Sequence, residues 1–199
     1  MDKALEAARQ AFLTEAECLR ETADRIDWDS FRAAVDVLAK AERIGASGCG
    51  HSGIACQHFA HLMCCIERPA RFISPSEAVH GGMGFVQKGD VMLLASRGGK
   101  TAELLPIMEI CRKKGVTVIA VTQNRESELA LGADIVLYMH VTQEVDPFNT
   151  QGTTSNTALN AQFDALQAAL IQKTDYKVDK FALVHPGGAV GARLNEKKA

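Results

Sequence analysis

The stretch that decides the fold is Gly48-Cys49-Gly50-His51-Ser52-Gly53. It lies between a short apolar run typical of a strand, residues 42–47, and a run typical of a helix, residues 53–66. A strand, a glycine turn and a helix together present backbone N–H groups and the positive end of a helix dipole to an anion. The glycines let the backbone approach such a ligand, and Ser52 adds a hydroxyl at the helix start. Taken alone, the stretch is weak evidence of an anion site, because most such loops in α/β proteins are plain turns.

Strands and helices alternate along the rest of the chain. Further strands are expected over residues 70–73, 90–95, 116–121 and 135–139, and further helices over residues 101–114, 127–131 and 155–172. This alternation predicts an α/β fold in which a doubly wound, five-stranded parallel sheet is flanked by helices in a flavodoxin-like three-layer sandwich. We expect one domain over residues 1–199, with N-terminal helices over about 1–40 and the sheet region over about 41–195. Ligands of such sheets bind at the carboxyl ends of the strands.

Composition narrows the class of protein. The 199 residues are 47% hydrophobic and 23% charged, which is ordinary for a globular protein. The net charge of -2 gives no reason to expect nucleic-acid or membrane binding, and no segment is apolar enough to span a bilayer. The N-terminus lacks the apolar core of a signal peptide. The six cysteines have no paired C-x-x-C spacing, so we interpret them as small buried residues of a cytoplasmic protein.

Two helices are expected ahead of the first strand. Leu5, Ala8 and Phe12 recur at helical spacing within residues 1–24, and a second helix begins after Asp27 or Asp29. One small sheet does not easily cover both helices. They are therefore candidates for packing between subunits, and we expect a homo-oligomer.

Three turns offer hydroxyls and backbone N–H groups at the starts of helices. They are residues 48–53, 96–101 and 153–157. Phosphate is the ligand that suits several such ends at once. None of the turns matches a P-loop, and the first lacks the third glycine of the dinucleotide-binding pattern. The turns therefore favour a phosphorylated small molecule over a nucleotide cofactor.

Six motifs, in their order and spacing, resemble the sugar isomerase (SIS) domain family, most closely the bacterial arabinose-5-phosphate isomerases. They are Gly48-Cys49-Gly50-His51-Ser52-Gly53, Ser76-Glu77-Ala78-Val79-His80-Gly81, Ser96-Arg97-Gly98-Gly99-Lys100-Thr101-Ala102-Glu103, Gln143-Glu144-Val145-Asp146-Pro147, Thr153-Thr154-Ser155-Asn156-Thr157 and His185-Pro186-Gly187-Gly188-Ala189-Val190-Gly191. The resemblance covers essentially residues 30–195. Many relatives carry paired CBS domains after the SIS domain, and because this chain stops at Ala199 we expect that module to be absent.

The chain departs from the family pattern in two loops. His51 stands where the family usually has lysine, and residues 96–101 replace Ser-Asn-Ser-Gly-Glu-Ser. The second exchange loses a hydroxyl at Gly98 and replaces an acid with Lys100. These departures bear on the substrate and the activity more than on the fold.

The resemblance implies two sets of site residues. The catalytic set is Glu144, Glu103, His80, His185 and His51. The set expected to bind the substrate phosphate is Gly50, Ser52, Ser96, Gly98, Lys100, Thr101, Thr154, Ser155 and Thr157.

Glu144 is the candidate for the base that moves the carbon-bound proton. It follows the fifth strand, and a partly closed pocket can raise the pKa of a carboxylate toward neutrality. Four of the catalytic candidates also have a structural explanation. Glu144 suits a solvated loop, Glu103 complements a helix dipole, His80 suits a helix-end cap, and His51 suits a helix start facing solvent. The resemblance places His185 at an active site, which can be that of a neighbouring subunit.

The function that the resemblance implies is aldose–ketose isomerisation through an enediol, with arabinose 5-phosphate and ribulose 5-phosphate as the expected pair. Neither a cofactor nor a metal is expected, since proton transfer requires neither. A homotetramer is expected from the habit of the family. Two alternatives stay open: an isomerase of another phosphosugar, such as a hexulose 6-phosphate, and a non-catalytic sugar-phosphate-binding protein.

Overall fold

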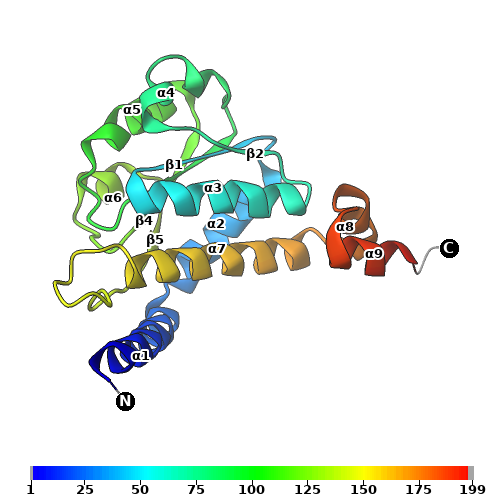
Figure 1. The fold of residues 1–199 in the computed structure, drawn as a ribbon. Coiled ribbons are helices and arrows are strands. Elements are labelled where there is room, and N and C mark those ends of the chain that lie inside the picture. Colours follow the sequence, from blue (N-terminus) through cyan, green and yellow to red (C-terminus); the bar gives the residue numbers. More distant parts are fainter. Residues whose placement is uncertain (1, 197–199) are drawn as a thin grey trace.

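The computed structural model describes residues 2–196 and shows a five-stranded, fully parallel sheet with helices on both faces (Figure 1). The expected single domain over 1–199 includes Met1 and residues 197–199, which lie outside the described residues. The strands are β1 (Ile44–Gly48), β2 (Ala70–Phe72), β3 (Val91–Ala95), β4 (Thr117–Thr122) and β5 (Ile135–Tyr138).

The helices of the described part of the chain fall into a large and a small group. The longer ones are α1 (Lys3–Arg25), α2 (Trp28–Lys40), α3 (Gly50–Cys65), α5 (Leu105–Lys114) and α7 (Thr154–Lys173). The shorter ones are α4 (Pro75–Ala78), α6 (Glu128–Gly132), α8 (Val178–Val184), α9 (Gly188–Glu196) and the 3-10 turns η1 (Gly82–Gly84) and η2 (Ala102–Leu104).

The strand order is β2-β1-β3-β4-β5, which confirms the predicted doubly wound sheet. The chain moves from β1 to its neighbour β2 on one side, and then crosses to β3 on the other side. The carboxyl ends of β1 and β3 are in register, with Gly48 opposite Ala95. The crevice where ligands bind in such sheets lies at this reversal of strand order.

Two hydrophobic layers enclose the sheet because its central strands are apolar on both faces. Along β3, Leu93 faces the layer formed with α2, α3 and α7, whereas Met92 and Leu94 face the layer beneath α5. In the first layer the rings of Phe59 and Phe163 lie 4.8 Å apart and join α3 to α7. This packing holds α3 against α7, and both helices begin at the carboxyl edge of the sheet.

Three details differ from the expectations from sequence. The helix expected over 101–114 begins with η2 and becomes α-helical only at Leu105, because Pro106 favours the first turn of a new α-helix. Residues around 178–196 form α8 and α9, which are too short and weakly patterned to be read from the sequence. Cys64 is exposed, so the expectation of six buried cysteines is wrong there; all six thiols are free.

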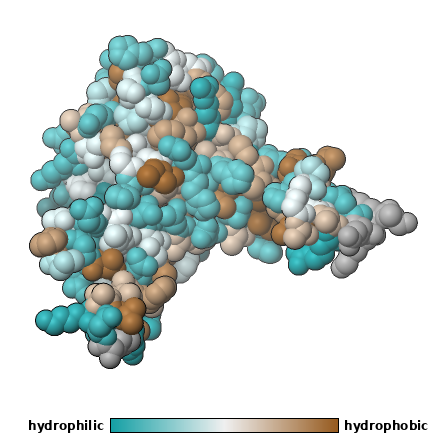
Figure 2. Space-filling view, in the orientation of Figure 1, coloured by the Kyte–Doolittle hydropathy of each residue, from teal (hydrophilic) through white to brown (hydrophobic). Residues whose placement is uncertain are grey.

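The two N-terminal helices, α1 and α2, differ in how much of their surface they bury against the rest of the chain. Helix α2 buries Phe31 and Leu38 against α7 and β5, so the expectation of subunit packing is wrong for the inner face of this helix. Helix α1 buries only Cys18 and Thr22, near its C-terminal end. Its N-terminal half projects from the domain with Phe12 exposed, and Figure 2 shows hydrophobic atoms on this projection. Among the described residues, no helix combines the length and apolarity that crossing a membrane requires.

An ion pair closes the amino edge of the sheet, opposite the candidate ligand edge. The buried carboxylate of Asp90 accepts hydrogen bonds from the backbone N–H of Arg43 at 3.1 Å and of Gln87 at 2.7 Å. It also pairs with Arg43 Nε at 2.8 Å. Asp90 therefore ties the start of β1 to the start of β3.

We expect Asp90→Ala to lower the free energy of unfolding by about 2–4 kcal/mol, because two buried N–H donors and a cation lose their acceptor. Urea denaturation measures this change. The matched control is Asp29→Ala, which removes an exposed carboxylate paired with Arg32 and should change stability by about 0.5 kcal/mol or less. Equal effects of the two substitutions would contradict the role assigned to Asp90.

Candidate active site

Two adjoining cavities occupy the carboxyl edge of the sheet. The larger has a volume of about 430 Å³, within the range of small-ligand sites. It is lined by the turn after β1, the start of α4 and the side chain of Glu103: Gly48, Cys49, Gly50, Gly53, Ile54, Gln57, Phe72, Ser74, Pro75, Ser76 and Glu103. Of these residues, Glu103 alone carries a charge.

The smaller cavity lies between the first turns of α3 and α7 and has a volume of about 20 Å³. Its lining is polar and basic on one side: His51, Ser52, Ser96, Arg97, Met139, Ser155, Asn156 and Leu159. Because Gly50 lines the large cavity while His51 and Ser52 line the small one, the first turn of α3 separates the two.

The loop after β3 has a shape that depends on Gly99. Its φ of +65° is left-handed, and an added Cβ would lie 2.0 Å from Ser127 Oγ, so no side chain fits there. The Gly99 N–H donates to Ser96 Oγ at 3.1 Å, and the hydroxyls of Ser96 and Thr101 lie 2.8 Å apart. Two of the hydroxyls expected at the phosphate are thus held close to one another.

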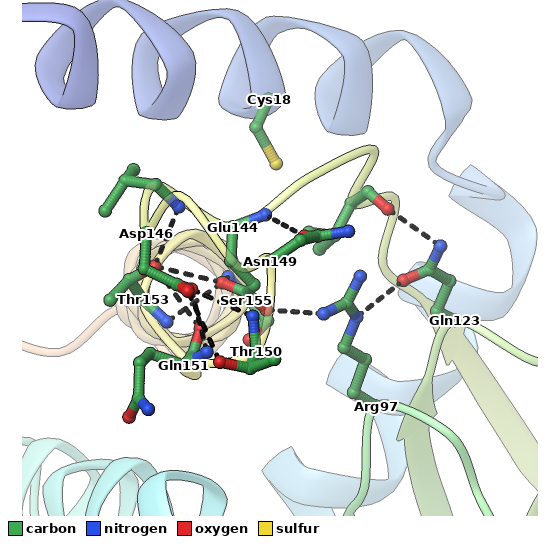
Figure 3. A network of polar contacts seen from close by, with 12 residues as sticks. Cys18, Arg97, Gln123, Glu144, Asp146, Asn149, Thr150, Gln151, Thr153 and Ser155 are labelled. Atoms are coloured by element: carbon green, nitrogen blue, oxygen red, sulfur yellow. Dashed lines mark hydrogen bonds and ion pairs between the residues drawn. The ribbon is translucent and has the colours of Figure 1, made fainter. Parts of the chain in front are cut away.

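The side chain of Glu144 accepts four hydrogen bonds at the ligand edge (Figure 3). Its Oε2 accepts hydrogen bonds from the Thr153 N–H at 2.9 Å, the Thr153 hydroxyl at 3.1 Å and the Ser155 N–H at 3.1 Å. Its Oε1 contacts Arg97 Nη1 at 2.5 Å. The carboxylate therefore caps α7 and neutralises the positive end of its dipole.

Arg97 is a site residue that the sequence reasoning noted only as a departure from the family pattern. Its Nε donates to Gln123 Oε1 at 3.1 Å, and Gln123 in turn donates to the carbonyl of Val141 at 2.8 Å. These contacts hold the guanidinium against Glu144. A long basic side chain directly after a central parallel strand was the available signal, since such positions face the ligand edge.

The expectation that the pocket raises the pKa of Glu144 is wrong. Burial raises the pKa, but hydrogen bonds from Ser155, the Arg97 guanidinium and the Thr153 N–H outweigh it and hold the pKa below its ordinary value. Together, the hydrogen bonds from Ser155 and Thr153 and the charge of Arg97 stabilise the ionised form more than burial destabilises it. The assignment of the base to Glu144 thus loses its physical premise, since such a carboxylate takes up a proton reluctantly at neutral pH.

The three histidines expected at the site are far from equivalent. His51 lines the small cavity and packs against Gly152. His80 is exposed just after α4. His185 lies between α8 and α9, with its ring stacked on Phe181 at 5.0 Å.

The α8–α9 arm, which carries His185, lies beyond the C-terminal end of α7 (Figure 1), and Glu144 lies at the other end of this helix. Glu144 bonds to the N-terminus of this 20-residue helix, whereas α8 and α9 follow its C-terminus. At 1.5 Å per residue the helix is about 30 Å long. Within one chain, the structure therefore does not bring His185 close to the candidate carboxylates Glu144 and Glu103.

The residues expected to bind phosphate divide into three groups. Gly50, Ser52, Ser96 and Ser155 line one of the two cavities. Gly98 and Lys100 are exposed on the loop, and Thr101 and Thr157 are half-buried. Thr154 is only 1% exposed, and its hydroxyl has no hydrogen-bond partner in the described part of the chain.

Within residues 2–196, no cluster of His, Cys, Asp or Glu side chains has the composition of a metal site.

The fold and these cavities define a doubly wound α/β protein with a cavity of small-ligand size at the switch point of its sheet. A model of the SIS domain matches residues 37–171, and the chain belongs to the SIS domain family.

Two bacterial arabinose 5-phosphate isomerases are similar in sequence to nearly the whole of this chain. The chain is 35% identical over 190 residues to the Pseudomonas aeruginosa arabinose 5-phosphate isomerase KdsD, covering 96% of this chain and 58% of that protein. It is 32% identical to the Escherichia coli arabinose 5-phosphate isomerase KpsF, covering 94% of this chain and 60% of that one. The chain thus spans less than two thirds of the length of these relatives.

Two solved structures share the fold closely. A Listeria monocytogenes protein provisionally named a sugar-phosphate isomerase superposes with a TM-score of 0.90 at 39% identity, over 94% of this chain and 100% of that chain. An Escherichia coli protein solved in complex with arabinose 5-phosphate superposes with a TM-score of 0.87 at 28% identity, over 94% of this chain and 100% of that chain.

We expect the contribution of Glu144 to the stability of the folded protein to decrease as the pH falls. Its folded-state pKa lies below the ordinary 4.5 of an unfolded chain. The stabilisation is therefore fully present above that value and is lost as the pH falls through the lowered folded-state pKa. Glu144→Gln should lower the free energy of unfolding at neutral pH, and the difference from wild type should shrink with increasing acidity. Urea titrations between about pH 3.5 and 7 measure it, with exposed Glu126→Gln as the control.

Proposed function

We propose that this protein is a phosphosugar aldose–ketose isomerase that acts through an enediol, with D-arabinose 5-phosphate and D-ribulose 5-phosphate as its substrate pair. The named relatives and the family support this proposal. An arabinose 5-phosphate molecule carries a phosphate at one end and the two reacting carbons at the other. Its site must therefore hold an anion and a base at separate places.

The observation that carries the proposal is the separation of charge between the two cavities. The large cavity contains the carboxylate of Glu103, and no basic residue stands among the described residues that line it. The small cavity contains Arg97 and His51. A phosphate group is favoured on the basic side, which leaves the sugar carbons on the side of Glu103.

Glu103 is the carboxylate that is free to act as the base. It is exposed, lines the large cavity and makes no ion pair among the described residues, whereas Glu144 is engaged by Arg97 and the start of α7. A carboxylate beside the open sugar chain can move a proton between two adjacent carbons. We assign this step to Glu103 and a positioning role to Glu144.

His185 completes the site from a neighbouring subunit in this proposal. The α8–α9 arm extends beyond α7 and exposes Leu183, Val184 and Val190 (Figures 1 and 2). Helix α1 exposes a second apolar surface that includes Phe12. Apolar surfaces on two projections support a homo-oligomer, which we propose to be a tetramer. The six free thiols suit a reducing cytoplasm as its location.

A different phosphosugar is the second candidate, because His51 and Lys100 depart from the family pattern at the ligand edge. A hexulose 6-phosphate would also place its phosphate in the small cavity and its carbonyl in the large one. A panel of pentose and hexose phosphates, assayed for interconversion, separates the candidates. Binding without conversion of any of them would leave the non-catalytic alternative and overturn the proposed activity.

We expect Glu103→Gln to reduce solvent deuterium exchange into the converted phosphosugar by a factor of roughly 100 to 10,000, because the variant keeps the shape but loses the base. Mass spectrometry of the recovered sugar measures the exchange. Glu144→Gln is the matched comparison and should reduce it less. A larger loss in Glu144→Gln than in Glu103→Gln would return the base to Glu144.

We also expect two inactive variants to restore each other. Subunits carrying Glu103→Gln and subunits carrying His185→Asn, refolded together in equal amounts, should regain about a quarter of the wild-type activity, because a mixed site can take Glu103 from a His185→Asn chain and His185 from a Glu103→Gln chain. The control is Glu103→Gln mixed with His51→Ala, whose two residues belong to the same chain's site. Equal activity in the two mixtures would show that His185 does not act across subunits.

A further inference from the structure

Arg97 has unused hydrogen-bonding capacity at the ligand edge. Its Nε and Nη1 donate to Gln123 and Glu144, while Nη2 has no hydrogen-bond partner in the described part of the chain (Figure 3). The side chain is 36% exposed, so water or a ligand reaches it. A guanidinium with a free terminal nitrogen can bind a second anion in addition to the one it already holds.

The small cavity beside Arg97 is favourable for an anion but is too small for a phosphate as the side chains stand. The 16-residue α3 and the 20-residue α7 both begin at it, with Ser52 and Ser155 in their first turns. Helix N-termini attract anions. Its volume of about 20 Å³ accommodates about one water molecule. A phosphate therefore enters only if a lining side chain moves.

The Glu144 carboxylate is itself an anion, and it is bound to the groups that would attract a phosphate, namely Arg97 and the start of α7. It accepts the N–H groups of Thr153 and Ser155 at the start of α7 and pairs with Arg97. If Arg97 turned away, Glu144 would keep its hydrogen bonds from Thr153 and Ser155. It would not become a buried charge without partners, which is the state that makes breaking such pairs costly.

We propose that Arg97 binds the substrate phosphate by exchanging Glu144 for it: Glu144 holds the guanidinium in the free protein, and the phosphate takes its place in the complex. This inference rests on the proposed function, since it takes the ligand to be a phosphosugar. Arg97 is then a residue that selects phosphorylated ligands, and Glu144 is a positioning residue that competes with them.

The chemistry of the two anions favours the exchange. A phosphate dianion carries more charge than a carboxylate and accepts two parallel N–H bonds from the guanidinium fork. Lys100 is the other cation of the same loop, but it is exposed at the tip and does not line either cavity. Arg97 is thus the strong cation that faces the small cavity.

The test measures affinity for inorganic phosphate and for arabinose 5-phosphate by titration calorimetry in four proteins: wild type, Glu144→Gln, Arg97→Gln and the double variant. Glu144→Gln removes the internal competitor, so phosphate should bind about three- to tenfold more tightly. Arg97→Gln should weaken binding about tenfold or more, equivalent to about 1.4 kcal/mol. In the double variant the gain from Glu144→Gln should disappear, because the gain acts through Arg97.

Neither the double variant nor Glu144→Gln contains the Glu144 carboxylate, so comparing these two proteins isolates the effect of Arg97 on phosphate binding from the loss of the Arg97–Glu144 ion pair. Arg97→Lys keeps the charge, loses the fork and should bind with intermediate affinity. Arg112→Gln, which removes a surface cation paired with Glu109, is the control and should bind as wild type does.

Two outcomes would overturn the inference. Unchanged phosphate affinity in Arg97→Gln would show that Arg97 does not contact the anion. A gain from Glu144→Gln that persists in the double variant would place the anion at the start of α7 without Arg97. The affinities for inorganic phosphate and for arabinose 5-phosphate are measured without turnover. Failure to convert any phosphosugar would therefore overturn the proposed activity, but the affinities would still show whether Arg97 binds the phosphate.

Discussion

The ion pair between Arg97 and Glu144 is the interaction on which the candidate site depends. It joins the loop after β3 to the loop after β5, and through Gln123 it also holds the end of β4. Because Glu144 caps α7, the same contact sets the loop in front of that helix. A single carboxylate thus fixes the shape of the ligand edge, and its charge is balanced by both a cation and a helix dipole.

The first turn of α3 divides the ligand edge into two chemically different compartments. Glycine at positions 48 and 50 brings the backbone to the floor of the large cavity, while His51 and Ser52 face the small one. A carboxylate on one side and a guanidinium on the other suit a ligand with an anionic end and a reactive uncharged end. This division, more than any single residue, is what the fold contributes to the proposed chemistry.

The architecture also explains why the site draws on more than one chain in our proposal. Helix α7 begins beside Glu144 and runs to the arm that carries His185, so its length keeps the two residues apart. The arm and the free half of α1 project from the domain and expose apolar side chains (Figures 1 and 2). Surfaces of this kind are stabilised by contact with another copy of the chain.

The sequence by itself determined the class of fold, the position of the glycine turn and the loops that meet at the carboxyl edge. These features depend on local periodicity and turn chemistry, as the buried run of β3 and the turn at Gly48–Gly53 show. Only the tertiary structure decided that Glu144 is ionised and engaged, that Arg97 faces the small cavity and that His185 lies far away. Those properties come from contacts between residues distant in the chain, such as Arg97 and Glu144, which are 47 positions apart. The pKa of an ionisable side chain in such a contact depends on the groups that surround it in the folded protein, and the spacing of residues in the sequence does not reveal those groups.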